Sequence, residues 1–332
     1  LFIAACSGSN EQAQGNVDEN NAAPQEQSQE QGNESKSDYP NGTIELIVPY
    51  SAGGTTDIIA RLLAEHASNY LPYQPQVVVV NKSGGNGVVG ATALKNAEPD
   101  GYTIGFTELA TLTIVPHVDP SVDIAYDSLQ PVLQAVSVPQ LVVTNSDAPW
   151  QTIDEWLEAM KNSDIPFLIG TTGFGGLQHL VVEQLKKVTG AQMEMVPLNG
   201  SSEVVTAILA GDVQAGILGV PNVMGNDKLL PLASSGSKTD VLPDLPTLKE
   251  KGLEVAGDLY FGLFAPKGID KEKLSILYDA FAKVLNESEV TQQLQEMGYQ
   301  IVPGDPSQFE QTISELNAHF STVVEQAGIA QQ

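Results

Sequence analysis

The sequence predicts an α/β fold of two lobes, each built on a mostly parallel sheet flanked by helices. From Tyr39 onward, short runs of Val, Ile and Leu alternate with segments in which apolar residues recur every three or four positions. This pattern is typical of strands alternating with helices. Glycine-rich turns join strands to the helices that follow, as in parallel βα units. Two extended segments, 131–145 and 255–266, are too long for the sheet of one lobe.

The first unit reads as a strand over 43–49, a turn over 51–56 and a helix over 57–71. The helix carries one apolar stripe, formed by Ile58, Ile59, Leu62, Leu63, Ala67 and Tyr70. Residues 76–81 predict a second strand, whose four consecutive valines indicate burial on both faces of the sheet.

The alternation continues with a short helix over 88–95, strands over 101–106 and 167–170, and a helix over 177–188. Long extended segments commonly carry a chain between lobes, so we expect crossings near Val138 and near Leu259. These crossings predict one lobe formed by 39–138 and 260–332, and a second lobe formed by 139–259.

The start of the chain has a different character. Ile3-Ala4-Ala5-Cys6 resembles the lipobox that ends a bacterial lipoprotein signal peptide, which would make Cys6 the lipidated end of an extracytoplasmic protein and 1–6 a remnant of that peptide. The alternative is a clipped hydrophobic end with an incidental cysteine. Residues 7–38 contain no aromatic side chain and are mostly Gln, Asn, Glu, Ser and Gly. They predict a disordered linker that tethers the folded body.

Composition excludes several classes of protein. Lys and Arg number 15 against 41 Asp and Glu, which gives a formal net charge of −26. Such a polyanion repels phosphate backbones, so nucleic-acid binding is excluded. The single cysteine excludes an internal disulfide and a cysteine-based zinc site. No run of apolar residues is long enough to span a membrane, so membrane association rests on the lipid anchor alone.

The first candidate binding site is the turn before the first helix, formed by Tyr50, Ser51, Ala52, Gly53, Gly54, Thr55, Thr56 and Asp57. Unpaired backbone N–H groups, hydroxyls and the positive end of a helix dipole would meet there and bind an anion. The alternative is an ordinary turn in which a threonine caps the helix. Asp57 and Arg61 are also spaced to pair on the helix surface. Arg61 is the only arginine, which disfavours a guanidinium clamp on the ligand.

A second candidate site repeats this construction before the helix at 177–188. It consists of Thr171, Thr172, Gly173, Phe174, Gly175, Gly176 and, inside the helix, His179. Two such turns from different lobes would grip one carboxylate from both sides. For His179, we favour a structural role over a contact with the ligand. Phe174 is either a lid over the ligand or an ordinary anchor of the loop.

A third segment, 85–90, matches the G-x-G-x-x-G pattern of dinucleotide sites. Three residues separate it from the preceding strand, and the helix that follows is short, so we interpret its glycines as allowing a close approach to the ligand site. The sequence has no nucleophile elbow, zinc-protease motif or Walker loop. It therefore predicts no enzyme, no cofactor and no metal.

Several motifs occur in order along the body: Ile47-Val-Pro-Tyr-Ser-Ala-Gly-Gly-Thr-Thr-Asp57, Pro99-Asp-Gly-Tyr-Thr103, Leu242-Pro-Asp-Leu-Pro-Thr247 and Phe261-Gly-Leu-Phe-Ala-Pro266. As a set they resemble the TctC/Bug family, the extracytoplasmic solute-binding receptors of tripartite tricarboxylate transporters. The resemblance implies a monomeric Venus-flytrap protein of the periplasmic-binding type. Such a protein would close on one small di- or tricarboxylate, such as citrate or a related organic acid, and deliver it to membrane permease subunits.

The resemblance also places further ligand contacts at Glu108, Leu109, Val220, Pro221, Asn222, Tyr260 and Phe261. Two departures from the family pattern concern specificity. Leu218-Gly219 stands where many members carry an Asp-Asn pair, and Ser51-Ala52 follows Tyr50 in the first loop, where a hydroxyl would favour a more polar ligand. The rival interpretations are a secreted enzyme that acts on a carboxylate through His179 and Asp57, and an adhesin with no ligand.

Overall fold

The computed structural model describes residues 38–255 and 257–330. Cys6 of the predicted lipobox and all of the predicted linker except Asp38 lie outside the described residues. In chain order the elements are β1 (Ile44–Val48), α1 (Thr55–Ala67), β2 (Val77–Asn81), η1 (Gly85–Gly87), α2 (Val88–Lys95), β3 (Thr103–Glu108), α3 (Ala110–Thr113), α4 (Val115–Val118), β4 (Leu129–Asn145), α5 (Ile153–Lys161), β5 (Phe167–Thr172), α6 (Leu177–Thr189), β6 (Met193–Leu198), α7 (Ser201–Ala210), β7 (Ala215–Gly219), η2 (Val220–Asn222), β8 (Leu229–Ser234), η3 (Lys249–Lys251), β9 (Asp258–Pro266), α8 (Lys271–Leu285), α9 (Ser288–Glu296), β10 (Gln300–Gly304) and α10 (Pro306–Ala327).

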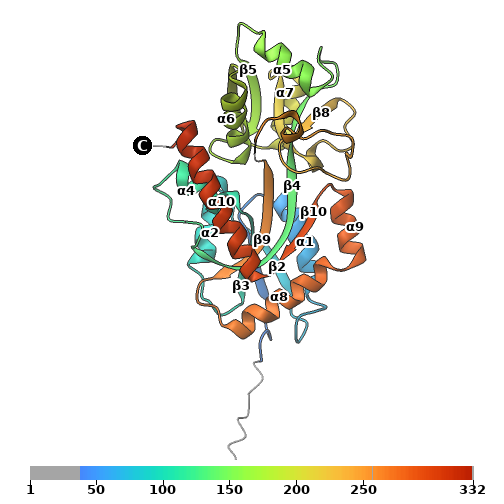
Figure 1. Ribbon diagram of the computed structural model, residues 1–332. Coiled ribbons are helices and arrows are strands. Elements are labelled where there is room, and N and C mark those ends of the chain that lie inside the picture. The colour runs from blue at the N-terminus through green and yellow to red at the C-terminus, as the bar shows by residue number, and fades with distance from the viewer. Residues whose placement is uncertain (1–37, 256, 331–332) are drawn as a thin grey trace, which may run out of the picture. The chain divides into compact units, whose positions relative to one another are not determined.

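The strands form a mixed sheet with helices packed against it (Figure 1). The strand order is β2-β1-β3-β9-β4-β7-β5-β6, and β8 and β10 also pair with β4. The predicted parallel pairing occurs between β1 and β2, β1 and β3, β5 and β6, and β5 and β7. All pairings of β4 are antiparallel, as is β3 with β9. The α/β fold is confirmed, but the two long strands make the sheet mixed rather than mostly parallel.

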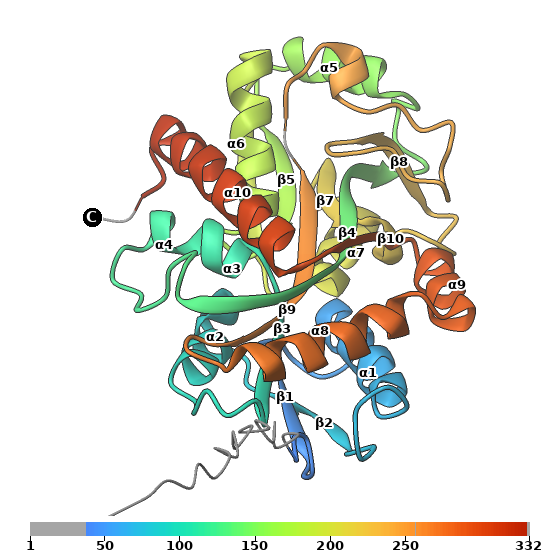
Figure 2. The ribbon, with the colours of Figure 1, turned by 60° about the horizontal axis from the view of Figure 1, so that its bottom comes forward.

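The long strand β4 changes partners along its length. It pairs with β9 from Leu129 to Pro139, and with β7 from Gln140 onward. Figure 2 shows β4 and β9 running side by side through the sheet. The described residues belong to one compact unit. The change of partner lies beside the predicted crossing at Val138, and the division into two lobes stays a prediction.

Strand β1 is buried on both faces because α1 and α2 cover it from opposite sides. Leu46 and Val48 belong to the same hydrophobic cluster as Ile59 of α1. Ile47, which points to the other face, belongs to the cluster that contains Leu94 of α2. This packing fixes the loop that follows β1 at the carboxyl end of the strand, directly before α1.

The prediction that the valines of β2 are buried on both faces is wrong. The side chain of Val78 is 43% exposed, and the other three valines are partly buried. β2 pairs only with β1 and ends the strand order. A run of valines fits an edge strand as well as a central one, because the sequence pattern reports β-propensity and not the position in the sheet.

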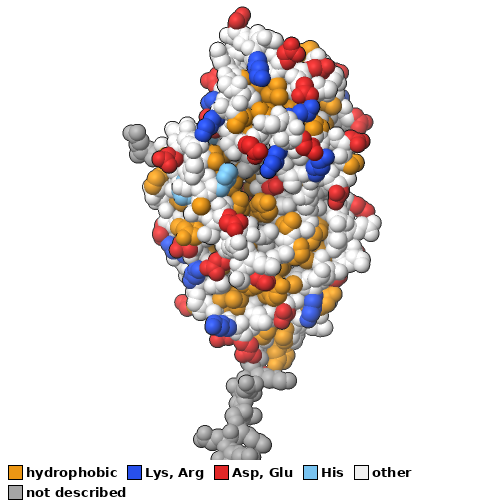
Figure 3. All heavy atoms as spheres, in the orientation of Figure 1, with side chains coloured by type: hydrophobic (Ala, Val, Ile, Leu, Met, Phe, Trp, Pro, Cys, Tyr) orange, Lys and Arg blue, Asp and Glu red, His pale blue; other side chains and the backbone are white. Residues whose placement is uncertain are grey.

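Charged side chains of both signs are interspersed on the face shown in Figure 3. No helix of the described residues is long and apolar enough to span a bilayer. Within the same residues, no group of three or more His, Cys, Asp or Glu side chains is arranged to hold a metal ion.

Candidate functional site

The loop between β1 and α1 is fixed by the carboxylate of Asp57. Its side chain is 3% exposed. It accepts the Gly53 N–H at 2.8 Å, Nε and Nη2 of Arg61 at 2.9 Å each, and Nδ2 of Asn81 at 2.8 Å. The pair between Asp57 and Arg61 suggested by their spacing is therefore present. With its oxygens occupied by these donors, Asp57 positions the loop.

These donors also set the protonation of Asp57. Burial raises its pKa, but the hydrogen bonds from Arg61, Gly53 and Asn81 outweigh burial and leave the pKa below its ordinary value. A carboxyl whose pKa is lower in the folded state stabilises the fold above its unfolded pKa of about 4 and loses that contribution as pH falls through the folded pKa.

We expect Asp57→Ala to lower the free energy of unfolding by about 2 kcal/mol at pH 7, because Gly53 and Asn81 lose a charged acceptor. The difference from the parent protein should shrink as pH falls below about 4. Urea unfolding at pH 7 and pH 3 measures it. A difference of the same size at both pH values would contradict the role given to the ionised carboxylate.

Two helices that follow candidate loops begin at a glycine with no side-chain cap. Gly54 is the N-cap of α1 and Gly176 the N-cap of α6. By contrast, Thr152, Asp270 and Asp305 cap α5, α8 and α10 with their side chains. The alternative that a threonine caps α1 is thus wrong. An uncapped first turn leaves backbone N–H donors at the positive end of the helix dipole.

The glycine amides of the first loop are already occupied. Gly53 N–H donates to Asp57, and Gly54 N–H donates to the Ser51 carbonyl at 3.3 Å. The amides of Thr55, Thr56 and Asp57, the first three residues of α1, are the ones left without an intrahelical acceptor. Donors for an anion therefore lie one residue beyond the glycines that the sequence pointed to.

The second loop is shaped by His179. Its Nδ1 accepts the Gly175 N–H at 3.0 Å, and its ring is 3% exposed. Burial lowers the pKa of His179, which favours the neutral ring that accepts this hydrogen bond. The ring lies 4.6 Å from that of Phe174, which is 42% exposed. His179 thus stabilises the loop through the Gly175 N–H, and Phe174 is the exposed aromatic side chain of the loop.

A chain of polar groups runs from Tyr50 beside the first loop. The Tyr50 hydroxyl lies 2.6 Å from Oε1 of Glu108 and 2.7 Å from Oγ1 of Thr111. Thr111 Oγ1 in turn donates to the Asn86 carbonyl at 3.1 Å. Burial raises the pKa of Glu108 despite the hydrogen bond from Tyr50, and burial together with Glu108 raises that of Tyr50 well above its usual range.

Asn86 connects the two candidate loops. Its Nδ2 donates to the Phe174 carbonyl at 2.9 Å, while its own carbonyl accepts from Thr111. Its φ of 50° places it in the left-handed region, which Asn tolerates better than most residues. Asn86, Thr111 and Asn81 are not among the site residues that the sequence predicts. An Asn between two glycines is the signal that would have identified Asn86.

Other candidate residues differ in what they offer a ligand. The side chains of Leu109, Val220 and Phe261 are at most 1% exposed and pack in the hydrophobic core, which leaves only their backbone groups for a ligand. The Leu109 N–H is already bonded to the Tyr260 carbonyl at 2.8 Å. Thr171 is fully buried and Thr56 is 4% exposed. Partly or fully exposed are Ser51, Ala52, Thr55, Thr172, Gly173, Pro221, Asn222 and Tyr260.

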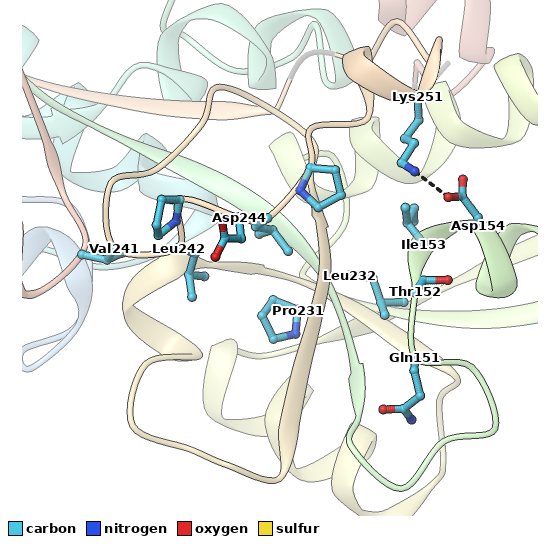
Figure 4. A pocket seen from close by; sticks show the side chains of 13 residues that line it. Gln151, Thr152, Ile153, Asp154, Pro231, Leu232, Val241, Leu242, Asp244 and Lys251 are labelled. Atoms are coloured by element: carbon cyan, nitrogen blue, oxygen red, sulfur yellow. Dashed lines mark hydrogen bonds and ion pairs between the residues drawn. The ribbon is translucent and has the colours of Figure 1, made fainter.

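A pocket of about 460 Å³ is lined by other residues (Figure 4). It is bounded by the start of α5 and by the proline-containing segment 241–246. Lys251 and Asp154 form an ion pair at its side, with 2.5 Å between Nζ and Oδ2. The pocket contains none of the candidate ligand residues.

The chain is similar to known transport proteins along most of its length. The family model described as tripartite tricarboxylate transporter family receptor matches residues 59–329. Protein BugT of Bordetella pertussis is 31% identical over 301 residues, which cover 87% of this chain and 90% of BugT.

Solved structures agree with these sequence relatives. The periplasmic binding protein BugD superposes with a TM-score of 0.78 at 25% identity, over 89% of this chain and 100% of BugD. The R. palustris protein Rpa4515 with adipate has a TM-score of 0.80 at 27% identity, over 88% of this chain and 99% of its own. Periplasmic relatives of this kind imply an extracytoplasmic location. The chain belongs to the tripartite tricarboxylate transporter receptor family, the TctC/Bug family of periplasmic solute-binding receptors, which are not enzymes.

Proposed function

We propose that this receptor binds a small carboxylate at the first turns of α1 and α6 and delivers it to a membrane permease. One observation carries the proposal: both helices begin at an uncapped glycine, and Asn86 joins the loop of α6 to the network of Tyr50. A helix start with free N–H donors favours negative charge. The similar protein Rpa4515, which is solved with adipate, makes a dicarboxylate the first ligand to test.

The acidic composition does not prevent a carboxylate from binding once it is within hydrogen-bond distance of the site. The Debye length at physiological salt is about 8 Å, so charges spread over the surface are largely screened. Backbone donors within hydrogen-bond distance of the carboxylate are not screened in this way. We expect the net charge of −26 to slow association more than it weakens the final complex.

A thermal-shift screen over mono-, di- and tricarboxylates, with adipate included, tests the proposal. A ligand present at a hundred times its Kd stabilises the folded state by about 2.7 kcal/mol, which corresponds to a rise in Tm of roughly 5 °C for a body of this size. Hexane-1,6-diol is the matched control, because it keeps the chain length of adipate and lacks both carboxylates. No shift with any acid, or an equal shift with the diol, would contradict the proposal.

Four finer statements stay proposals. Closure of the lobes at 39–138 with 260–332 and at 139–259 would enclose the ligand, in a protein that works as a monomer. The closed form would be the one that the permease recognises.

Lipidation of Cys6 would hold the receptor at the membrane, and membrane fractionation of the parent protein and of Cys6→Ser tests this anchor.

A further inference from the structure

The peptide unit between Phe174 and Gly175 is held at both of its polar ends. Its N–H donates to Nδ1 of His179 at 3.0 Å, and its carbonyl accepts a hydrogen bond from Nδ2 of Asn86 at 2.9 Å. This peptide is trans and planar, so its N–H and its carbonyl point in opposite directions. The two hydrogen bonds therefore depend on each other, because a turn of the peptide plane breaks both.

These two bonds join segments that are distant in the chain. Asn86 belongs to η1, in the predicted lobe that includes 39–138, whereas the peptide and His179 belong to the predicted lobe at 139–259. Helix α4 packs against the same loop, since a Cβ at Gly175 would lie 2.9 Å from Cγ1 of Val118. The peptide is thus a point of contact between the two predicted lobes.

The hydrogen bond from Gly175 determines the protonation of His179. A backbone N–H can only donate, so Nδ1 is the unprotonated nitrogen of a neutral ring, and the ring hydrogen is on Nε2. A charged imidazole carries a hydrogen on both nitrogens. Protonation would therefore set two donors against each other at 3.0 Å, and the bond to the peptide would be lost. Burial, which lowers the pKa of His179, agrees with this geometry.

The charges near His179 on its own helix partly balance. Oε1 of Glu183 lies 3.8 Å from Nε2 of His179 and favours a charged ring, but Nζ of Lys186 lies 2.8 Å from the same oxygen and opposes it. Strands β5 and β7, on which α6 packs, contain no titratable side chain. The remaining titratable groups on the surrounding elements are Lys187, Glu194 of β6, Glu254, His319 of α10 and His117 of α4, which is bonded to Asn317.

We propose that neutral His179 is a positioning residue for the ligand: it holds the peptide before Gly175 so that the carbonyl meets Asn86, and protonation of the ring releases both the peptide and the ligand. This inference rests on the proposed function. The peptide lies directly before Gly176, the N-cap of α6, so its direction sets how the loop borders the free N–H groups of the first turn. Gly175 has φ of +77°, and glycine allows such a peptide to turn at little cost.

The pH dependence has a definite sign. The ligand binds the form in which His179 is neutral, so binding lowers the pKa of His179 further. Affinity should be constant above the pKa of His179 in the free protein and should fall by up to tenfold per pH unit below it. A charged His179 that attracted the carboxylate directly would give the opposite result, with tighter binding in acid.

His179→Asn tests this role, because Oδ1 of Asn stands as many bonds from the backbone as Nδ1 of His and accepts a hydrogen bond without titrating. Titration calorimetry with the tightest acid of the screen gives the ratio of parent affinity to variant affinity at each pH. Protonation of the ligand affects both proteins and leaves this ratio unchanged. The ratio should be constant near neutral pH and fall in acid. His319→Asn, the matched control, should keep the parent profile.

Asn86→Gly tests the other end of the peptide. Glycine tolerates the φ of 50° at this position, so the change removes only the side chain. It should weaken binding, and the further loss caused by His179→Leu, which has no acceptor, should be smaller in Asn86→Gly than in the parent protein. Equal further losses would overturn the role given to the peptide.

Nitrogen-15 NMR of the imidazole rings gives a readout in the parent protein itself. The chain has four histidines, and the resonances absent from His179→Asn identify this one. They should show a neutral ring with its hydrogen on Nε2, and a titration that moves to lower pH when ligand is added. A hydrogen on Nδ1 at neutral pH, or an affinity ratio that stays constant or rises in acid, would overturn the role of His179 and leave the proposed function intact. Failure of every acid to bind would overturn both.

Discussion

Gly54→Asp should lower the affinity for the carboxylate ligand by about 100-fold, or about 2.7 kcal/mol. The new side chain would stand at the N-cap of α1, where its carboxylate accepts first-turn N–H groups that the ligand would otherwise use. It also adds a negative charge beside the position proposed for the ligand. The fold should tolerate the change with a small shift of the loop: φ at this position is −79°, and the first atom of a side chain would lie 3.3 Å from the Ser51 carbonyl, which must move by a few tenths of an ångström. Asp is also a favoured N-cap.

Gly54→Asn separates the two causes. Asn has the same shape and also caps a helix, but it carries no charge. We expect it to lose about tenfold in affinity, from competition for the N–H groups alone. Titration calorimetry with the same acid measures all three proteins, and unfolding curves check that they are equally folded. Parent-like affinity in Gly54→Asp would remove the first turn of α1 from the binding site.

Gly87→Ala should destabilise the protein by about 3 kcal/mol and weaken ligand binding at the same time. Gly87 has φ of +89°, which strains any residue with a side chain. A Cβ at this position would lie 2.6 Å from Oγ1 of Thr111 and 2.8 Å from the Tyr50 hydroxyl. Because both groups belong to the network of Glu108, relief of the clash must break that network.

Gly85→Ala is the matched control for this prediction. It also places a side chain at positive φ, +56°, but the new atom would only contact Val88 at 3.5 Å, an ordinary distance. It should destabilise by about 1 kcal/mol and leave affinity close to that of the parent protein. Thermal unfolding and calorimetry compare the two. Equal losses in both variants would mean that backbone strain, and not the Tyr50 network, explains the effect of Gly87→Ala.

Local patterns predicted the elements that carry the site. The strand at 43–49, the glycine turn and the helix that follows correspond to β1, the loop at 49–54 and α1. The helix at 177–188 corresponds to α6, which ends one residue later. Each of these assignments depends on the spacing of apolar residues within a few turns of chain. The burial of the β2 valines was predicted wrongly for the same reason, because the spacing of residues does not reveal which strand lies at the edge of the sheet.

The contacts that define the candidate site join residues far apart in sequence, and spacing carries no information about them. The proximity of Glu108 to Tyr50 spans 58 residues, and that of Asn86 to Phe174 spans 88. Burial of Val220 and Phe261 likewise depends on which helices and strands pack over them.

By itself, the sequence determined the alternation of strands and helices, the two glycine turns and the resemblance to a family of receptors, because these are properties of short segments. The tertiary structure alone decided which amides remain free, which acid lies beside which hydroxyl, and that Asn86 lies between the loops. Those properties follow from close packing of distant segments, where a shift of one ångström decides whether a donor meets an acceptor.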